Sequence, residues 1–130
     1  MLVKRIAVLG AALLSLALGK AVLAQDASGH YVRIAELEVD PDQLGAFKAA
    51  IREGIETAVR VEPGVLALYA VSDHEDASRI RVFEVYVSAE AYRTHLETPH
   101  FRKFRETTDK MVKSRKLSDA VPIALRAKPQ

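Results

Sequence analysis

An acid, two tyrosines and two histidines lie within 17 residues of this chain: Glu84, Tyr86, Tyr92, His95 and His100. Carboxylates and imidazoles are the usual groups for proton transfer near neutral pH, and a tyrosine hydroxyl can donate a hydrogen bond beside them. The cluster therefore predicts a small pocket that holds acid–base groups.

Glu84 lies inside an apolar strand pattern, on the same phase as Ile80, Val82 and Tyr86. Successive side chains of a strand point to opposite faces, so Glu84 and Tyr86 are expected on one face. A carboxyl group in that position is partly buried, and burial raises its pKa. It is interpreted as a pocket acid or base. The alternative is a buried acid held by a neighbouring arginine or a backbone N–H.

His95 and His100 stand on either side of an expected helix break. Ser88 suits the N-cap of one helix, and Thr98-Pro99 suits the start of the next. The two imidazoles are candidate proton shuttles in the pocket; capping or core histidines are the alternative. We predict no metal, because no third ligand follows at a recognisable spacing. We also predict no cofactor, because there is no phosphate-binding loop, dinucleotide fingerprint or cysteine.

The elements that must position these residues follow the order β-α-β-β-α-β, an α+β, ferredoxin-like split βαβ arrangement. Strands are expected at 31–39, 65–71, 79–87 and 117–125, and an amphipathic helix is expected to follow the first strand, with Asp40 as its N-cap and Pro41 at its first position. The second helix is broken at Thr98. Its inner stripe is expected to run to Met111, with basic residues near its C-terminus: Lys113, Arg115 and Lys116.

The segment from Val65 to Val71 is apolar without alternation. A strand of this kind must be covered on both faces, but the helices of one small domain can cover only one side of its sheet. We therefore expect a second subunit on the other side, and so a homodimer.

Residues 1–24 have the features of a secretory signal peptide. Lys4 and Arg5 precede an uncharged apolar run of 13 residues, and Val22-Leu23-Ala24 offers a cleavage site. We expect a periplasmic or secreted protein without stable membrane association after cleavage; an uncleaved anchor is the alternative. A flexible lead at 25–30, one domain at 31–125 and a tail at 126–130 are expected to follow.

The charge of the chain after such a cleavage argues against nucleic acid as a partner. Loss of residues 1–24 leaves 16 of the 19 basic residues against 17 acidic ones. No basic field of the kind that binds nucleic acid then remains. The absence of cysteine excludes disulfides, so the domain must be stabilised by packing alone or by packing with a partner subunit.

Several short motifs together resemble the antibiotic biosynthesis monooxygenase family, near its quinol monooxygenase-like branch. They are Glu62-Pro-Gly64, Phe83-Glu-Val-Tyr86, Ala91-Tyr92 with His95-Leu96, and Thr98-Pro-His-Phe101. The resemblance extends from about Tyr31 to Leu125. It is fairly specific for the family and only weakly specific for any one substrate.

This resemblance implies a dimeric α+β barrel, in which two ferredoxin-like units pack their open sheet faces together. Enzymes of the family oxidise quinols or phenols with O2, without metal or flavin. The resemblance further implies that Glu84, His95 and His100 are the acid–base candidates. The candidates for substrate binding are Tyr69, Tyr86, Tyr92 and Phe101, although ordinary core packing is the alternative for Tyr69 and Phe101.

Two other functions stay open beside a cofactor-independent monooxygenase. One is a non-catalytic dimer that binds or carries an aromatic metabolite, and the other is haem binding through His95 or His100. Haem-degrading relatives use an active-site tryptophan, but this chain has no tryptophan, and Tyr86 stands where one often follows the strand glutamate. That departure argues against haem degradation.

Overall fold

The computed structural model of the protein describes residues 29–130, and the expected signal peptide at 1–24 lies outside this range. Within it, no helix is long and apolar enough to cross a membrane. Four strands form one antiparallel sheet: β1 (Tyr31–Val39), β2 (Val65–Ser72), β3 (Arg79–Tyr86) and β4 (Val112–Ala120). Their order in the sheet is β2-β3-β1-β4, which confirms the expected α+β, ferredoxin-like arrangement.

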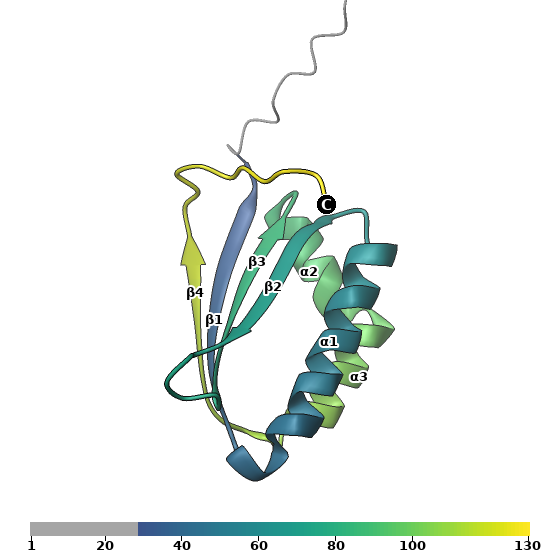
Figure 1. The fold of residues 1–130 in the computed structure, drawn as a ribbon. Helices are drawn as coiled ribbons and strands as arrows, with labels where there is room; N and C mark the ends of the chain where they lie inside the picture. The colour runs from purple at the N-terminus through teal and green to yellow at the C-terminus, as the bar shows by residue number, and fades with distance from the viewer. Residues whose placement is uncertain (1–28) are drawn as a thin grey trace, which may run out of the picture.

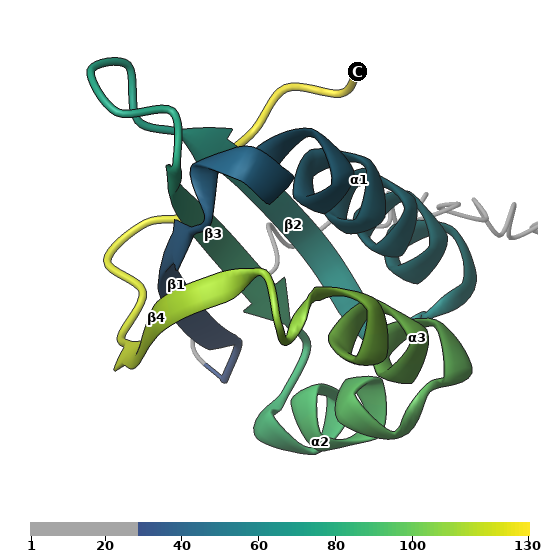
Figure 2. The ribbon, with the colours of Figure 1, turned by 90° about the horizontal axis from the view of Figure 1, so that it is seen from below.

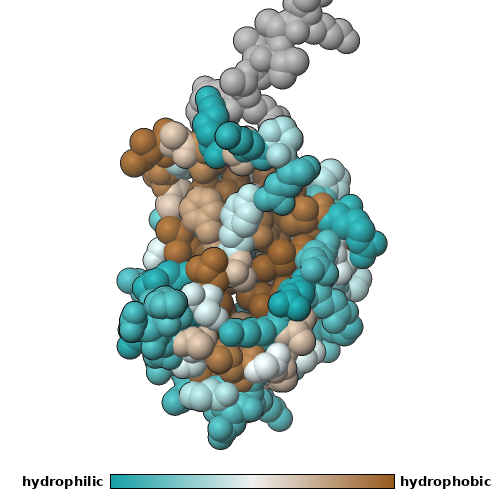
Figure 3. All heavy atoms as spheres, in the orientation of Figure 1, coloured by the Kyte–Doolittle hydropathy of each residue, from teal (hydrophilic) through white to brown (hydrophobic). Residues whose placement is uncertain are grey.

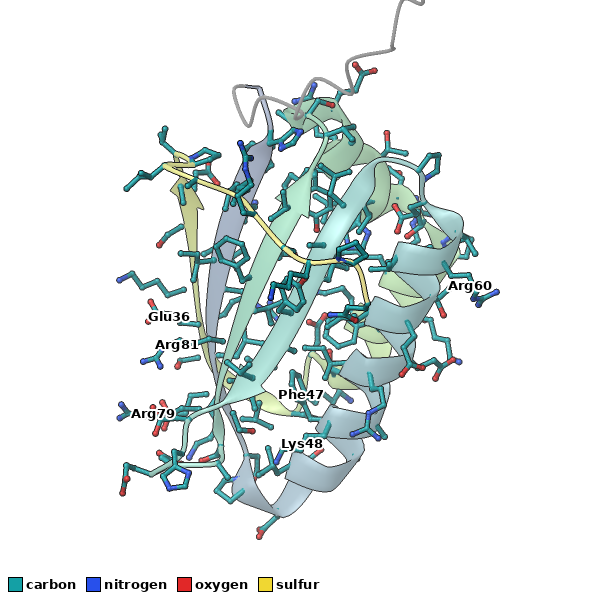
Figure 4. All side chains as sticks on the ribbon, turned by 45° about the horizontal axis from the view of Figure 1, so that its top comes forward. Glu36, Phe47, Lys48, Arg60, Arg79 and Arg81 are labelled. Carbon is teal, nitrogen blue, oxygen red and sulfur yellow. The ribbon has the colours of Figure 1, made fainter. Side chains whose placement is uncertain are left out.

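Three α-helices pack on one face of this sheet: α1 (Leu44–Val61), α2 (Ala89–Glu97) and α3 (Pro99–Thr108) (Figures 1 and 2). Among residues 29–130, none forms a helix on the opposite face of the sheet (Figure 2). We call these the inner and the outer face. Phe47 lies between α1 and the inner face, whereas Glu36 and Arg81 project from the outer face (Figure 4).

The expected N-caps are confirmed by their hydrogen bonds. The side chain of Asp40 accepts from the Asp42 backbone before a short 3-10 turn, Pro41–Gln43, that leads into α1. Ser88 accepts from Ala91 N at the start of α2, and Thr98 accepts from Phe101 N at the start of α3. These caps use backbone N–H groups that have no partner inside a helix.

The core between helices and sheet consists of two buried clusters. The first is built on β1, β3 and α1 around Phe47 and Val82, and the second lies around Ala58, Val65, Leu68 and Tyr86. Full burial of a side chain of this size contributes about 1.5–3 kcal/mol of stability. The clusters therefore hold both α1 and the α2–α3 pair to the inner face.

The prediction for the last strand is wrong. Residues 117–125 were expected, but β4 is Val112–Ala120 and ends before Pro122. The strand pairs with β1 from Val39 opposite Val112 to Val32 opposite Ala120. It therefore begins soon after α3 ends at Thr108, which places Met111 beyond the helix. The three basic residues assigned to the helix C-terminus lie in β4: Lys113, Arg115 and Lys116.

Candidate active site

A cavity of about 410 Å³ lies between the inner face of the sheet and the helices. Most of its wall is apolar, with Leu37 and Val82 from the sheet and Ile51, Phe101 and Phe104 from the helices. Its polar wall is formed by a few side chains: Glu84, Tyr92, His95, His100, Arg105 and Arg115. An apolar cavity with few polar groups is typical of sites for small organic molecules.

The two cavity histidines share one carboxylate oxygen of Glu62. His95 Nδ1 lies 2.8 Å and His100 Nε2 lies 2.6 Å from Glu62 Oε2. All three side chains are largely buried: 7% of the His95 side chain is exposed, 17% of His100 and 10% of Glu62. A carboxylate that accepts from both rings fixes the tautomer of each, so that His95 Nε2 and His100 Nδ1 become the basic nitrogens.

Local structure brings these three residues together from different elements. Glu62 is the C-cap of α1, and the following turn is held by a hydrogen bond from Val87 N to Gly64 O. Thr98 ends α2 and caps α3, and its hydroxyl donates to the carbonyl of His95. The helix break therefore places the two histidines around the end of α1.

Glu84 lies on the inner face with Tyr86, as the strand phase predicts. Tyr86 Oη donates to Glu84 Oε1 at 2.9 Å. Burial raises the pKa of the Glu84 carboxyl, against the lowering effect of the tyrosine hydrogen bond and of His95 and Arg33. Burial and the neighbouring Glu84 also raise the pKa of Tyr86, so its hydroxyl stays protonated as a donor.

Tyr92 is held against the cavity by Arg33. The Arg33 guanidinium donates to the Tyr92 hydroxyl, and its carbon lies 4.6 Å from the centre of the tyrosine ring. Asp119 pairs with the same arginine at 3.4 Å. Burial raises the pKa of Tyr92, more than the arginine beside it lowers it. Tyr92 therefore also remains a neutral hydroxyl at the cavity wall.

The structure brings together five of the residues predicted from the sequence: Glu84, Tyr92, His95, His100 and Phe101 all line the cavity. Tyr86 lies beside them as a fully buried donor to Glu84. Tyr69 does not join them. It is opposite Phe83 in the register, on the outer face, and is 50% exposed.

Glu62 is the functional candidate that sequence reasoning missed. In the sequence it was noted only as the first residue of the Glu62-Pro-Gly64 motif, with no chemical role assigned to it. Its partners are 33 and 38 residues away in the chain. The one available signal was an acid at the end of a helix that had to pack against the histidine-bearing helices.

Glu62 also supplies the third donor that a metal site would need. One ligand atom from each of Glu62, His95 and His100 lies within 4.8 Å of the others. The two O–N distances of 2.6 and 2.8 Å are hydrogen-bond lengths, so the residues stand as a hydrogen-bonded triad.

The fold and this site define a small α+β protein with a hydrogen-bonded glutamate–histidine–histidine triad in an apolar cavity. The family model for antibiotic biosynthesis monooxygenase matches residues 30–107. The chain therefore belongs to the antibiotic biosynthesis monooxygenase family. A comparison with curated proteins gives no significant match.

Solved structures agree with this assignment. One is a protein from Bacteriodes thetaiotaomicron that is provisionally named an antibiotic biosynthesis monooxygenase. It is 38% identical to this chain with a TM-score of 0.76, and the match covers 81% of this chain and 100% of the other. One from Nitrosomonas europaea, with the same provisional name, is 28% identical with a TM-score of 0.69, over 72% and 90%. A provisionally named monooxygenase from Lactobacillus acidophilus is 30% identical with a TM-score of 0.69, over 70% of this chain and 43% of its own.

Proposed function

We propose that the protein is a cofactor-independent monooxygenase that oxidises a quinol-like or phenolic molecule with O2. The observation that carries this proposal is the hydrogen-bonded triad Glu62–His95–His100 on the wall of an otherwise apolar cavity. The family and the provisional names of its relatives support the class of reaction. The quinol-like substrate is what the resemblance to the quinol monooxygenase-like branch implies.

In the first step, His95 or His100 takes the proton of the phenolic hydroxyl. The Glu62 carboxylate stabilises the resulting imidazolium and, before the transfer, fixes the tautomer in which the nitrogen that takes the proton carries the lone pair. Glu84, whose pKa is raised, and the neutral Tyr92 hydroxyl hold the substrate oxygens by hydrogen bonds. A hydrogen-bonded histidine–carboxylate pair is therefore the base, and the other polar groups orient the ring.

The electron-rich phenolate then reacts with O2 without an added reductant. It transfers an electron to O2, and the radical pair combines to form a carbon–oxygen bond and a ring hydroperoxide. Cleavage of the O–O bond with loss of the ring C–H proton releases water and leaves a carbonyl. A hydroquinone and O2 thus give a hydroxyquinone and water. The apolar wall favours this sequence because it keeps bulk water from the anion.

The proposal includes a homodimer joined through the outer face of the sheet. Leu66, Tyr69 and Val71 of β2 are 38%, 50% and 58% exposed. Figure 3 shows an apolar area in the middle of this view, bordered by hydrophilic side chains. A dimeric α+β barrel would cover it. The expected export signal makes the periplasm or the exterior the proposed location.

Oxygen uptake by chelator-treated protein with a set of hydroquinones tests the proposed activity. We expect uptake with at least one hydroquinone, and its loss in His100→Ala and in Glu84→Ala. Absence of uptake with every hydroquinone would contradict a monooxygenase. Saturable binding without uptake would then identify a non-catalytic binder, and a shifted Soret band lost in His95→Ala or His100→Ala would identify a haem protein.

A further inference from the structure

The polar groups of the cavity are divided between two ends. His100 is the second residue of α3, and Arg105 of the same helix also lines the cavity. Five residues of α-helix correspond to about 7.5 Å along the axis. One helix thus presents an acid–base group and a guanidinium to the same cavity, separated by about the length of a fused aromatic ring system.

The sheet repeats this separation. In the register, Glu84 lies opposite Arg33 of β1, and Arg115 lies opposite Leu37, four residues farther along β1. The backbone positions of Glu84 and Arg115 are therefore about 13 Å apart along the strands and about 10 Å apart across them. The long side chain of Arg115 reduces the distance between the two charged groups. Arg115 therefore reaches the cavity from the end that is remote from Glu84.

The remote end carries an excess positive charge. Arg105 Nε lies 3.0 Å and Arg115 Nη2 lies 3.4 Å from the same oxygen, Asp109 Oδ1. The two arginines line the cavity, whereas Asp109 does not. One carboxylate thus balances two guanidinium groups, and N–H donors remain for a further anion. The Arg115 side chain is 26% exposed, so the attraction is only partly screened.

We propose that the substrate is a phenol or quinol with a carboxylate at the end of its ring system opposite the reacting hydroxyl. This inference rests on the proposed function, because it uses the triad end of the cavity for the hydroxyl. Arg105 and Arg115 bind the carboxylate, to which a guanidinium offers paired donors. The apolar wall between the two ends, including Val82 and Phe104, contacts the rings.

Binding of 6-hydroxy-2-naphthoate tests this inference directly, because its hydroxyl and carboxylate lie at opposite ends of two fused rings. Its methyl ester keeps the rings and the hydroxyl but removes the charge. We expect the acid to bind about tenfold more tightly than the ester by calorimetry. We expect no such preference for 1-hydroxy-2-naphthoate over its ester, because its two groups are adjacent.

Three variants assign the preference to the arginines. Arg115→Gln is expected to remove most of the difference between acid and ester. Asp109→Asn is expected to increase the difference in affinity between acid and ester, because the substitution frees both guanidinium groups. A merely structural role of the arginines would not produce such an increase. Arg102→Gln is the control, since Arg102 is also on α3 but pairs with Glu97 at the surface, with 61% of its side chain exposed.

Equal affinities for acid and ester, or an unchanged preference in both Arg115→Gln and Asp109→Asn, would overturn the inference. Binding of neither compound would overturn it as well. Equal affinities together with hydroquinone oxidation would leave the proposed monooxygenase in place. Conversely, a preference for the acid without oxygen uptake by any substrate would support the anion site and contradict the monooxygenase.

Discussion

Glu62 is the residue on which both cavity histidines depend. Its Oε2 is the hydrogen-bond partner of each ring, and all three side chains are largely buried. Without this charge, neither tautomer is fixed and an imidazolium formed during proton transfer loses its counterion. The chemistry of the site therefore depends on a residue whose sequence motif, Glu62-Pro-Gly64, does not by itself indicate an acid–base role.

Glu62→Gln is predicted to lower kcat for oxygen uptake by about a hundredfold or more, the usual contribution of a positioned acid–base group. The amide keeps the shape of the side chain but removes the charge. Glu53→Gln is the control, because Glu53 pairs with Lys103 at the surface and is 62% exposed. Similar rates in Glu62→Gln and Glu53→Gln would show that the triad has no catalytic role.

Glu84→Gln is predicted to stabilise the fold increasingly as pH rises. The folded-state pKa of Glu84 is raised above its ordinary value of 4.5 by burial. The folded state therefore gains stability from the neutral carboxyl of Glu84 at pH values below 4.5. It loses that stability as pH rises through the folded-state pKa and the buried carboxyl becomes charged. A glutamine can still accept from Tyr86 but carries no charge to bury.

Thermal unfolding from pH 4 to pH 8 checks this prediction. The melting temperature of Glu84→Gln relative to the unmodified protein should rise across this range and show little difference at the acid end. Glu90→Gln, in the first turn of α2, gives the comparison for an exposed acid. A difference that is constant with pH would mean that the folded-state pKa of Glu84 is not raised.

At the scale of elements, the turn between α1 and β2 fixes the site. A Cβ on Gly64 would lie 2.6 Å from the Cβ of Ala91 in α2. The absence of a side chain at this position allows α2 to approach the turn that follows Glu62. Close packing here therefore brings His95 within hydrogen-bond distance of Glu62.

Gly64→Ala is predicted to lower the free energy of unfolding by about 1–3 kcal/mol through overpacking. The double variant Gly64→Ala with Ala91→Gly should recover part of that loss, because it removes the atom that clashes. Gly45→Ala, in α1 with open space around it, is expected to be neutral or stabilising. Chemical denaturation measures all three, and an undiminished loss in the double variant would contradict this explanation.

The order of the elements could be predicted because local signals mark their boundaries. Asp40, Ser88 and Thr98 are caps whose side chains bind the backbone N–H groups that the sequence suggested. β4 was misplaced because it lies at the edge of the sheet and has few apolar residues, so its sequence has no strand periodicity. Its place is set by pairing with β1, which no local pattern reveals.

The candidate site could be predicted only in part, for the same reason. Strand alternation placed Glu84 and Tyr86 on one face, and the helix break placed His95 near His100. The Glu62 contacts depend on packing between helices that are distant in sequence. The Arg105–Asp109–Arg115 group depends on packing between the helix α3 and the strand β4. Tyr69 was assigned to the cavity because the apolar run of β2 does not indicate which face each residue occupies.

On the scale of the whole molecule, the outer face of the sheet is the surface that we propose a second subunit covers. Tyr69, Phe83 and Ile34 are opposite one another in the register and form a row across three strands. Val121 and Ile123, beyond β4, are 90% and 102% exposed. Apolar side chains so arranged are typical of an interface between subunits.

Tyr69→Glu is predicted to convert the proposed dimer into a monomer, because it buries a charge at the centre of the interface without a partner. Light scattering of the unmodified protein should give the mass of two chains and that of the variant the mass of one. His74→Glu, in the loop between β2 and β3, should leave the mass unchanged. A monomeric unmodified protein would contradict the proposed dimer.

The most direct test of the central claim is the fate of labelled oxygen. Chelator-treated protein is given a hydroquinone that it consumes under ¹⁸O₂, and the product is analysed by mass spectrometry. The account predicts one ¹⁸O atom in each hydroxyquinone, with the other recovered in water, and loss of this product in Glu62→Gln. An unlabelled quinone with hydrogen peroxide, or no reaction without added metal, would contradict a cofactor-independent monooxygenase.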